Sequence, residues 1–206
     1  MPTSTRTERP FAPSCERNRE PILTVLRERL ADRHLLLEVG SGTGQHAVYF
    51  APHFPQLRWQ TTDRAENLPG IRAWLDEARL PNTPPVIELD VTRDWPSIPA
   101  HDVVFTANTL HIMPWQAVEC LFQGLPTVMC EGALLIIYGP FNYKGAFTSE
   151  SNAAFDTTLK RDDPRRGIRD MEQVDELARQ AGMRLIDDVA MPSNNRCLVW
   201  QKIREN

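Results

Sequence analysis

The chain has 206 residues, of which 41% are hydrophobic and 24% are charged, and its net charge at pH 7 is −4. This length and composition are typical of a single globular domain with a substantial hydrophobic core. The acidic balance argues against a nucleic-acid backbone as the main partner. No apolar run approaches the ~20 residues that a membrane span requires, so we expect no membrane partner.

The polar N-terminus lacks the apolar segment of a signal peptide, and residues 1–13 are predicted to form a flexible arm. Residues 14–206 are predicted to form one domain, in a cytoplasmic protein that is a monomer or a homodimer. Because the cysteines form no C-x-x-C pair, we expect reduced thiols, with neither a disulfide framework nor a metal site; they are Cys15, Cys120, Cys130 and Cys197.

The first predicted element is a helix that begins near Glu16, or at Pro21 if the proline occupies the first turn. The apolar run 35–39 then predicts a buried strand. Three alternating glycines follow this run, and a helical pattern resumes after Gly44 until Pro52 ends it. Strand, tight turn and helix in this order are typical of the opening of a nucleotide-binding α/β unit.

The spacing in the turn distinguishes between two classes of ligand. A dinucleotide fingerprint would have its third glycine at the position that Gln45 occupies. The pattern acid-x-Gly-x-Gly-x-Gly instead resembles motif I of the S-adenosylmethionine-dependent methyltransferases, which holds the methionine end of the cofactor. This resemblance assigns the following residues to cofactor binding: Glu38, Gly40, Ser41, Gly42, Thr43 and Gly44.

The second and third predicted strands, residues 57–63 and 86–91, carry acids near their ends. Asp63 lies 19 residues beyond Gly44, near the offset at which such a unit places a carboxylate on a ribose. It would be equally well placed to cap the next helix. By the same resemblance, Asp90 and Val91 are expected near the adenine of the cofactor.

The fourth predicted strand, residues 102–108, leads into a segment that contains the best candidate for a catalytic base. Ligands of such sheets bind outside the carboxyl ends of the strands, so Asn108 is assigned to the cofactor. His111 has an ordinary pKa near ~6.5, which suits proton transfer near neutral pH. The alternative is a histidine that is hydrogen-bonded to backbone and only shapes the pocket.

The fifth predicted strand, residues 132–138, is apolar throughout and ends at Tyr138, a second catalytic candidate. The helices that follow are predicted over 151–160 and 170–181. Strands over 185–191 and 197–203 are joined by so short a connection that they must pair antiparallel. Substrate contacts are predicted for Arg17, Asn18, Phe141, Asn152, Asp156, Arg169 (toward a carboxylate) and Asn194. The aromatic residues are equally consistent with the core, and the arginine with a solvated loop.

These elements predict a Rossmann-like α/β fold. We expect a seven-stranded, mostly parallel sheet with helices on both faces and a C-terminal antiparallel hairpin. This is the class I methyltransferase architecture, whereas a nicotinamide-binding domain usually continues with another parallel unit.

The chain also resembles, nearly end to end, the bacterial and eukaryotic methyltransferase family that includes methyltransferase-like protein 26. The resemblance rests on motif I and on several polar segments outside it, notably Glu16-Arg17-Asn18, Leu89-Asp90-Val91-Thr92, Tyr138-Gly139-Pro140, Gly167-Ile168-Arg169-Asp170 and Met191-Pro192-Ser193-Asn194-Asn195. It implies the fold and the cofactor, S-adenosylmethionine with S-adenosylhomocysteine as product, but not the substrate.

The first functional hypothesis is therefore methyl transfer to an O, N or S atom of a small molecule. A protein methyltransferase and a non-catalytic S-adenosylmethionine-binding protein remain alternatives. A nicotinamide-dependent oxidoreductase is the least favoured of the four, because of Gln45 and the hairpin.

Overall fold

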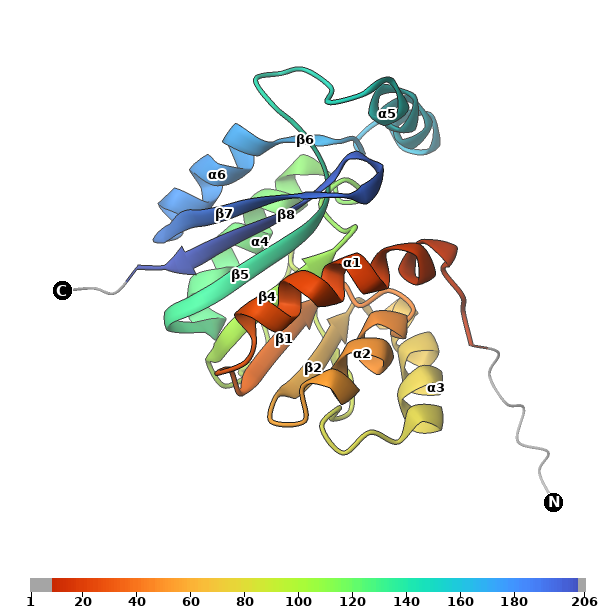
Figure 1. Cartoon of the computed structure of the whole chain (residues 1–206), viewed down its shortest axis with the longest axis vertical. Helices are drawn as coiled ribbons and strands as arrows, with labels where there is room; N and C mark the ends of the chain where they lie inside the picture. Colours follow the sequence, from red (N-terminus) through yellow and green to blue (C-terminus); the bar gives the residue numbers. More distant parts are fainter. Residues whose placement is uncertain (1–8, 204–206) are drawn as a thin grey trace. The chain divides into compact units, whose positions relative to one another are not determined.

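The computed structural model of the chain describes residues 9–203 (Figure 1). The chain divides into two compact units: unit 1 ends at Asp90 and unit 2 begins at Val91. Residues 1–8 of the predicted arm lie outside the described residues, and the single domain over 14–206 stays a prediction. No helix within residues 9–203 has the length and apolar character needed to cross a bilayer.

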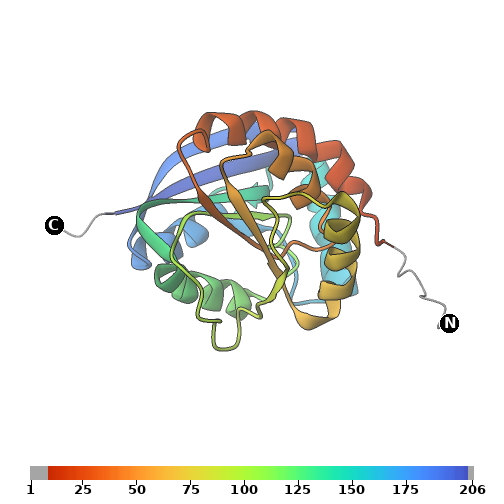
Figure 2. The same ribbon diagram turned by 90° about the horizontal axis from the view of Figure 1, so that it is seen from below.

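Unit 1 contains three parallel strands in the order β3-β2-β1. Its helix α2 contacts α1 and α3 (Figures 1 and 2). The helices and strands of this unit are α1 (Pro13–Arg29), β1 (Leu35–Val39), α2 (Gln45–Phe50), β2 (Arg58–Asp63), α3 (Leu68–Ala78) and β3 (Ile87–Glu88).

Two boundaries in unit 1 differ from those predicted. Helix α1 begins at Pro13, before Glu16, and Pro21 lies inside it. Proline suits the first turn of a helix, where Pro13 lies, because a backbone N–H at that position would have no helical partner. Strand β3 is only two residues long, so most of the predicted strand 86–91 is irregular backbone.

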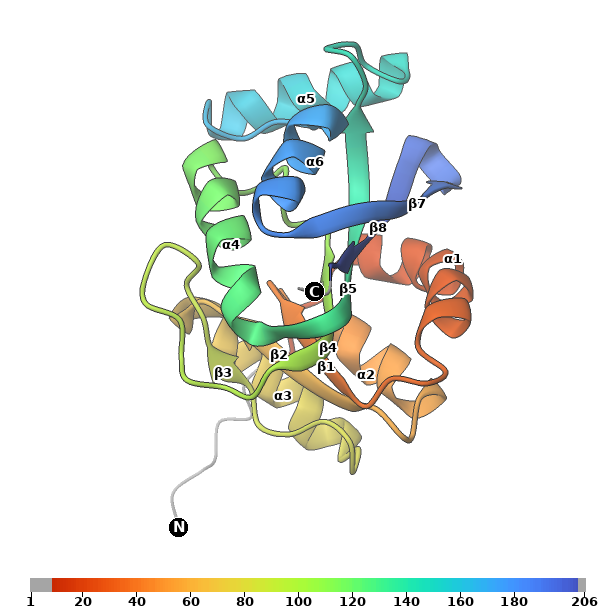
Figure 3. The same cartoon turned by 90° about the vertical axis from the view of Figure 1, so that its left-hand side faces the viewer.

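Unit 2 contains the strands in the order β4-β5-β8-β7, with the short β6 paired to the far end of β5. Helix α6 contacts α4 and β7 (Figure 3). The elements of this unit are β4 (His101–Ala107), α4 (Trp115–Val128), β5 (Met129–Asn142), α5 (Glu150–Asp162), β6 (Arg169–Asp170), α6 (Met171–Gln180), β7 (Met183–Met191) and β8 (Asn195–Lys202).

The predicted C-terminal hairpin is confirmed, since β7 and β8 pair antiparallel. The α/β class with mostly parallel pairing is confirmed as well: β1, β2 and β3 pair in parallel, as do β4 and β5. The described residues form eight strands where seven were predicted, because Arg169 and Asp170 pair with Phe141 and Asn142 as β6. A two-residue strand has no period that a sequence pattern could reveal.

The core of each unit is built from the apolar runs that predicted its strands. In unit 1, Leu36 and Trp59 are fully buried on β1 and β2. In unit 2, Phe105, Ile136 and Trp200 are fully buried on β4, β5 and β8. Burial of each such side chain stabilises the fold by roughly 1.5–3 kcal/mol, and this holds the strand ends rigidly in place.

Candidate functional site

The glycine turn, residues 40–44, is fastened to the end of β2. The backbone N–H groups of Gly40 and Ser41 both donate to the carbonyl oxygen of Thr62 at 3.0 Å. The hydroxyl of Thr62 donates back to the carbonyl oxygen of Glu38 at 2.7 Å. The turn is therefore a fixed extension of two neighbouring parallel strands.

Two glycines of the turn are required for different reasons. Gly44 has φ +88°, and a Cβ at this position would lie 3.2 Å from Cα of Ile71 on α3, so it permits close packing of α2 on α3. Gly42 has φ +60°, but a Cβ there would meet no atom within 4 Å. Bare backbone with space in front of it is what a glycine-rich turn offers to a ligand.

Asp63 lies beside Gly42, as the motif predicts, and its carboxylate supports the turn. Its Oδ2 accepts a hydrogen bond from the Gly42 N–H at 2.7 Å. Its Oδ1 accepts from the Arg64 N–H at 2.7 Å and from Nδ2 of Asn67 at 2.8 Å. The helix-capping alternative is not borne out, because neither bond goes to a backbone N–H in the first turn of the following helices. A carboxylate has about four acceptor positions, and these three bonds leave one of them.

Glu38 is an acid buried inside unit 1, with 2% of its surface exposed. Its Oε2 accepts from Nε1 of Trp59 at 3.0 Å. Burial raises the pKa of Glu38 to about 7; the bonds from Trp59 and Ser41 oppose the rise, and the nearby charge of Asp63 adds to it. Glu38 is thus poised between its neutral and charged forms near neutral pH.

Gln45, which stands where a dinucleotide fingerprint would have its third glycine, anchors the segment before α1. Its Oε1 accepts from the Ala12 N–H at 2.6 Å and from the Thr43 hydroxyl at 3.0 Å, and its Nε2 donates to Glu16 at 3.4 Å. Nearby, Arg9 pairs with Glu77 on α3 at 2.9 Å. Residues 9–12 of the predicted arm are thus tied to the turn and to α3.

Replacing Gln45 by alanine should destabilise unit 1 by about 1–3 kcal/mol, because two donors lose their buried acceptor. The free energy of unfolding in urea measures this loss. Gln180→Ala is the matched control, since the Gln180 amide is exposed and bonds only to Glu176 of its own helix. Equal stabilities for the two variants would contradict the anchoring role.

The remaining predicted residues of unit 1 lie in different surroundings. Asn18 is buried, and its Oδ1 lies 2.8 Å from Nε2 of His46, whose pKa burial lowers to about 4. Arg17 is exposed on α1. Asp90 follows β3, where the neighbouring Leu89 N–H donates to the carbonyl oxygen of Asp63 at 2.8 Å. Substrate or adenine contacts of these side chains stay predictions.

In unit 2, the structure brings the ends of β4 and β5 together. The Asn108 N–H donates to the carbonyl oxygen of Tyr138 at 2.8 Å, with Asn108 at φ +57°. A Cβ added to Gly139 would lie 3.7 Å from Nδ1 of His111, so the imidazole faces β5. Val91, at the start of unit 2, is buried.

His111 is only 5% exposed. Burial and, to a smaller extent, the positive charge of Arg169 together lower the pKa of its imidazole to about 4. The ring is therefore neutral near pH 7, which leaves one nitrogen able to accept a proton or a hydrogen bond. The ring of Phe155 lies edge-on to it, with centroids 5.4 Å apart.

The predicted substrate residues of unit 2 form two groups. Asn152, buried on α5, donates through Nδ2 to the carbonyl oxygen of Asn194 at 3.1 Å. Phe141 is buried on β5, where it pairs in register with Arg169. The guanidinium of Arg169 donates to backbone carbonyls, among them that of Leu110 at 3.0 Å.

Residues 9–202 match the family described as protein of unknown function (DUF938). The chain belongs to the DUF938 family. The matched region includes both the glycine turn and His111.

Solved structures with a similar fold are methyltransferases by name, and the SibL protein is named as S-adenosylmethionine-dependent. The apo structure of methyltransferase SibL has a TM-score of 0.77 and 23% identity, over 93% of the DUF938 chain and 56% of SibL. An O-methyltransferase family protein from Burkholderia thailandensis has a TM-score of 0.77 and 16% identity, over 94% and 58%. Human N-acetylserotonin methyltransferase, solved with S-adenosylmethionine, has a TM-score of 0.72 and 15% identity, over 93% and 53%.

The DUF938 chain thus spans less than two thirds of the length of each of these proteins. At such identities the likeness shows the fold, which is that of the class I methyltransferases and agrees with the predicted architecture. Across residues 9–203, the DUF938 structure groups no three His, Cys, Asp or Glu side chains in a way that could hold a metal ion.

Proposed function

We propose that this protein is an S-adenosylmethionine-dependent methyltransferase that acts on an O, N or S atom of a small molecule. The names of its structural neighbours support the proposal, because they include a mitomycin 7-O-methyltransferase and an N-acetylserotonin methyltransferase. The polar segments outside motif I further support kinship with the family that includes methyltransferase-like protein 26.

The observation that carries the proposal is the open backbone at Gly42 beside the carboxylate of Asp63. The turn, residues 40–44, would hold the methionine end of the cofactor, and the remaining acceptor position of Asp63 a ribose hydroxyl. Asp90 would lie near the adenine amino group, and cofactor contacts of Val91 and Asn108 stay predictions. When bound, S-adenosylmethionine supplies a methyl group on a sulfonium, which is ready for in-line displacement by a nucleophile.

His111 would accept a proton from an O–H or N–H nucleophile of the acceptor. Its imidazole is neutral at pH 7, so one ring nitrogen can accept, but the pKa lowered to about 4 makes it a weaker base than the ordinary histidine expected from the sequence. The assignment of His111 therefore rests on its position beside β5. Tyr138 and Phe141 are only 4% and 1% exposed, so both rings lie in the core of unit 2 and are not part of this proposal; their catalytic and substrate roles stay predictions.

Isothermal titration of the purified protein with S-adenosylhomocysteine tests cofactor binding, with NADH as the comparison ligand. Saturable heat with S-adenosylhomocysteine and none with NADH supports the proposal, and the reverse contradicts it. Labelled S-adenosylmethionine and fractionated cell extract then test turnover, with mass spectrometry to find the methylated product. Label in low-mass fractions supports a small-molecule acceptor, whereas label confined to proteins indicates a protein methyltransferase.

A further inference from the structure

Three backbone carbonyl groups around His111 accept hydrogen bonds from one short segment of unit 2, residues 167–169. Nε of Arg169 donates to the carbonyl oxygen of Leu110 at 3.0 Å, and its Nη2 donates to that of Met113. The Gly167 N–H donates to the carbonyl oxygen of His111 itself at 3.1 Å. Residues 167–169 are therefore hydrogen-bonded to the backbone before, at and after the histidine.

Residues 167–169 are held in turn by Asp156, a residue of α5 whose surface is only 4% exposed. Its Oδ1 accepts from the Ile168 N–H at 2.8 Å, and its Oδ2 pairs with Nζ of Lys160 at 2.6 Å. A Cβ added to Gly167 would lie 2.9 Å from Oδ1 of Asp156, so this packing requires a glycine. Both carboxylate oxygens are thus engaged within unit 2.

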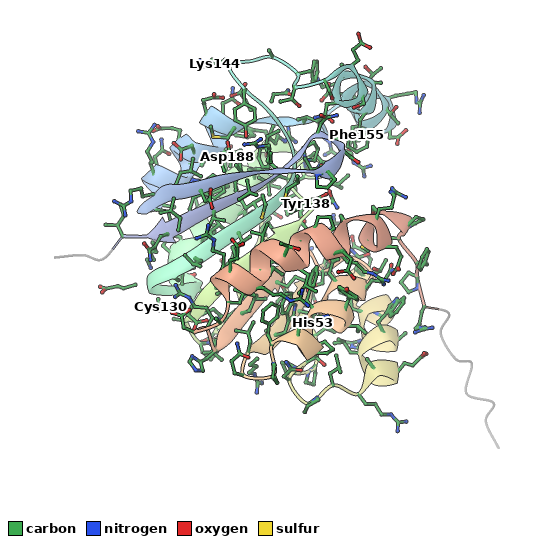
Figure 4. All side chains as sticks on the ribbon, in the orientation of Figure 1. His53, Cys130, Tyr138, Lys144, Phe155 and Asp188 are labelled. Atoms are coloured by element: carbon green, nitrogen blue, oxygen red, sulfur yellow. The ribbon has the colours of Figure 1, made fainter. Side chains whose placement is uncertain are left out.

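The same helix also contacts the imidazole directly. Phe155, next to Asp156, lies edge-on to His111 with an interplanar angle of 71°. Figure 4 shows Phe155 on α5. Helix α5 thus contacts the imidazole through Phe155, and through Asp156 it holds the segment that bonds to the backbone of His111.

We propose that Arg169 and Asp156 are positioning residues that fix the orientation of His111, and that they are not ligands of the methyl acceptor. The guanidinium of Arg169 already donates to the carbonyl oxygens of Leu110, Met113 and Arg165. Each carboxylate oxygen of Asp156 also has a partner. A substrate carboxylate at Arg169 would have to displace these bonds. This positioning role rests on the proposed function, in which His111 acts on the nucleophile and must therefore be held in a productive geometry.

The ring current of Phe155 shifts the nuclear magnetic resonance signal of the His111 ring protons, because the two rings are in contact. The chemical shift of this signal therefore tests the proposal. His111→Asn identifies the signal by its absence, and Phe155→Leu gives its position without the ring. In Arg169→Gln and Asp156→Ala, the signal is expected to leave its wild-type position. Two matched controls should retain it: Arg165→Gln, whose exposed guanidinium pairs with Asp163, and Arg161→Gln, whose exposed guanidinium pairs with Asp162.

An unmoved His111 signal in folded Arg169→Gln and Asp156→Ala would overturn the proposal, as would equal displacement in the two controls. If Arg169→Gln does not fold, Arg169→Lys takes its place under the same criteria, because lysine keeps the charge but loses the planar fork. The measurement needs neither cofactor nor acceptor, so its result is independent of whether the protein binds S-adenosylhomocysteine. With an acceptor in hand, positioning predicts a lower kcat with little change in KM, whereas a ligand role predicts a higher KM.

Discussion

Gly42→Leu is expected to lower the affinity for S-adenosylhomocysteine by at least about 100-fold, equivalent to about 2.8 kcal/mol. A Cβ at Gly42 would have no protein atom within 4 Å apart from its chain neighbours, so the leucine side chain is expected to enter the space proposed for the cofactor. The left-handed backbone at φ +60° adds a strain of roughly 1–2 kcal/mol, which the fold should tolerate. Isothermal titration measures the affinity.

Gly182→Leu is the matched control for this change. Gly182 follows α6 in unit 2 with φ +74°, and a Cβ there also meets nothing within 4 Å. The two variants should therefore lose similar stability, while only Gly42→Leu loses the cofactor. Wild-type affinity in Gly42→Leu would show that the cofactor does not bind at the turn.

Glu38→Gln is expected to make the stability of the protein less dependent on pH. The pKa of Glu38 is raised from its ordinary 4.5 to about 7, so its neutral form is favoured by folding. Stability from this group is fully present below pH 4.5 and is lost as the pH rises through 7. Relative to wild type, the variant should gain roughly 3 kcal/mol between pH 4.5 and pH 8, because the glutamine stays neutral.

Urea unfolding of both proteins across this pH range gives the difference in free energy. His46 and His111 have pKa values lowered to about 4, so their contribution is present above pH 6.5 and is lost as the pH falls toward 4. Both histidines remain in the variant and cancel from the difference. Glu66→Gln, at an exposed position, is the control and should give a flat difference. A flat difference for Glu38→Gln would mean that Glu38 is ionised without cost.

The glycine turn combines structural and ligand-directed roles that a motif alone does not separate. Gly44 is required by the approach of Ile71, whereas Gly42 faces open space. Asp63 both holds the turn and retains an acceptor position. Mutation of Asp63 would therefore disturb fold and binding together, which makes Gly42 the sharper test.

The polar residues near the predicted substrate site illustrate the limit of reasoning from residue type. Arg169 is a chemically sound candidate for a carboxylate, yet its guanidinium donates to the carbonyls that flank His111. Asp156 and Lys160 stand four residues apart on α5, a spacing from which their ion pair could have been foreseen. The hydrogen bond from the Ile168 N–H to Asp156 joins two separate segments, so no sequence spacing could have predicted it.

The sequence by itself determined the α/β class, the strand–turn–helix at residues 35–50 and the antiparallel C-terminal hairpin. Each follows from local rules: apolar runs predict buried strands, glycine spacing predicts the turn, and a short connection forces antiparallel pairing. Only the tertiary structure decided which polar groups are already engaged, as with Asn18 against His46 and Gln45 against Ala12. Hydrogen-bond partners far apart in the chain are selected by packing, and no local pattern records that choice.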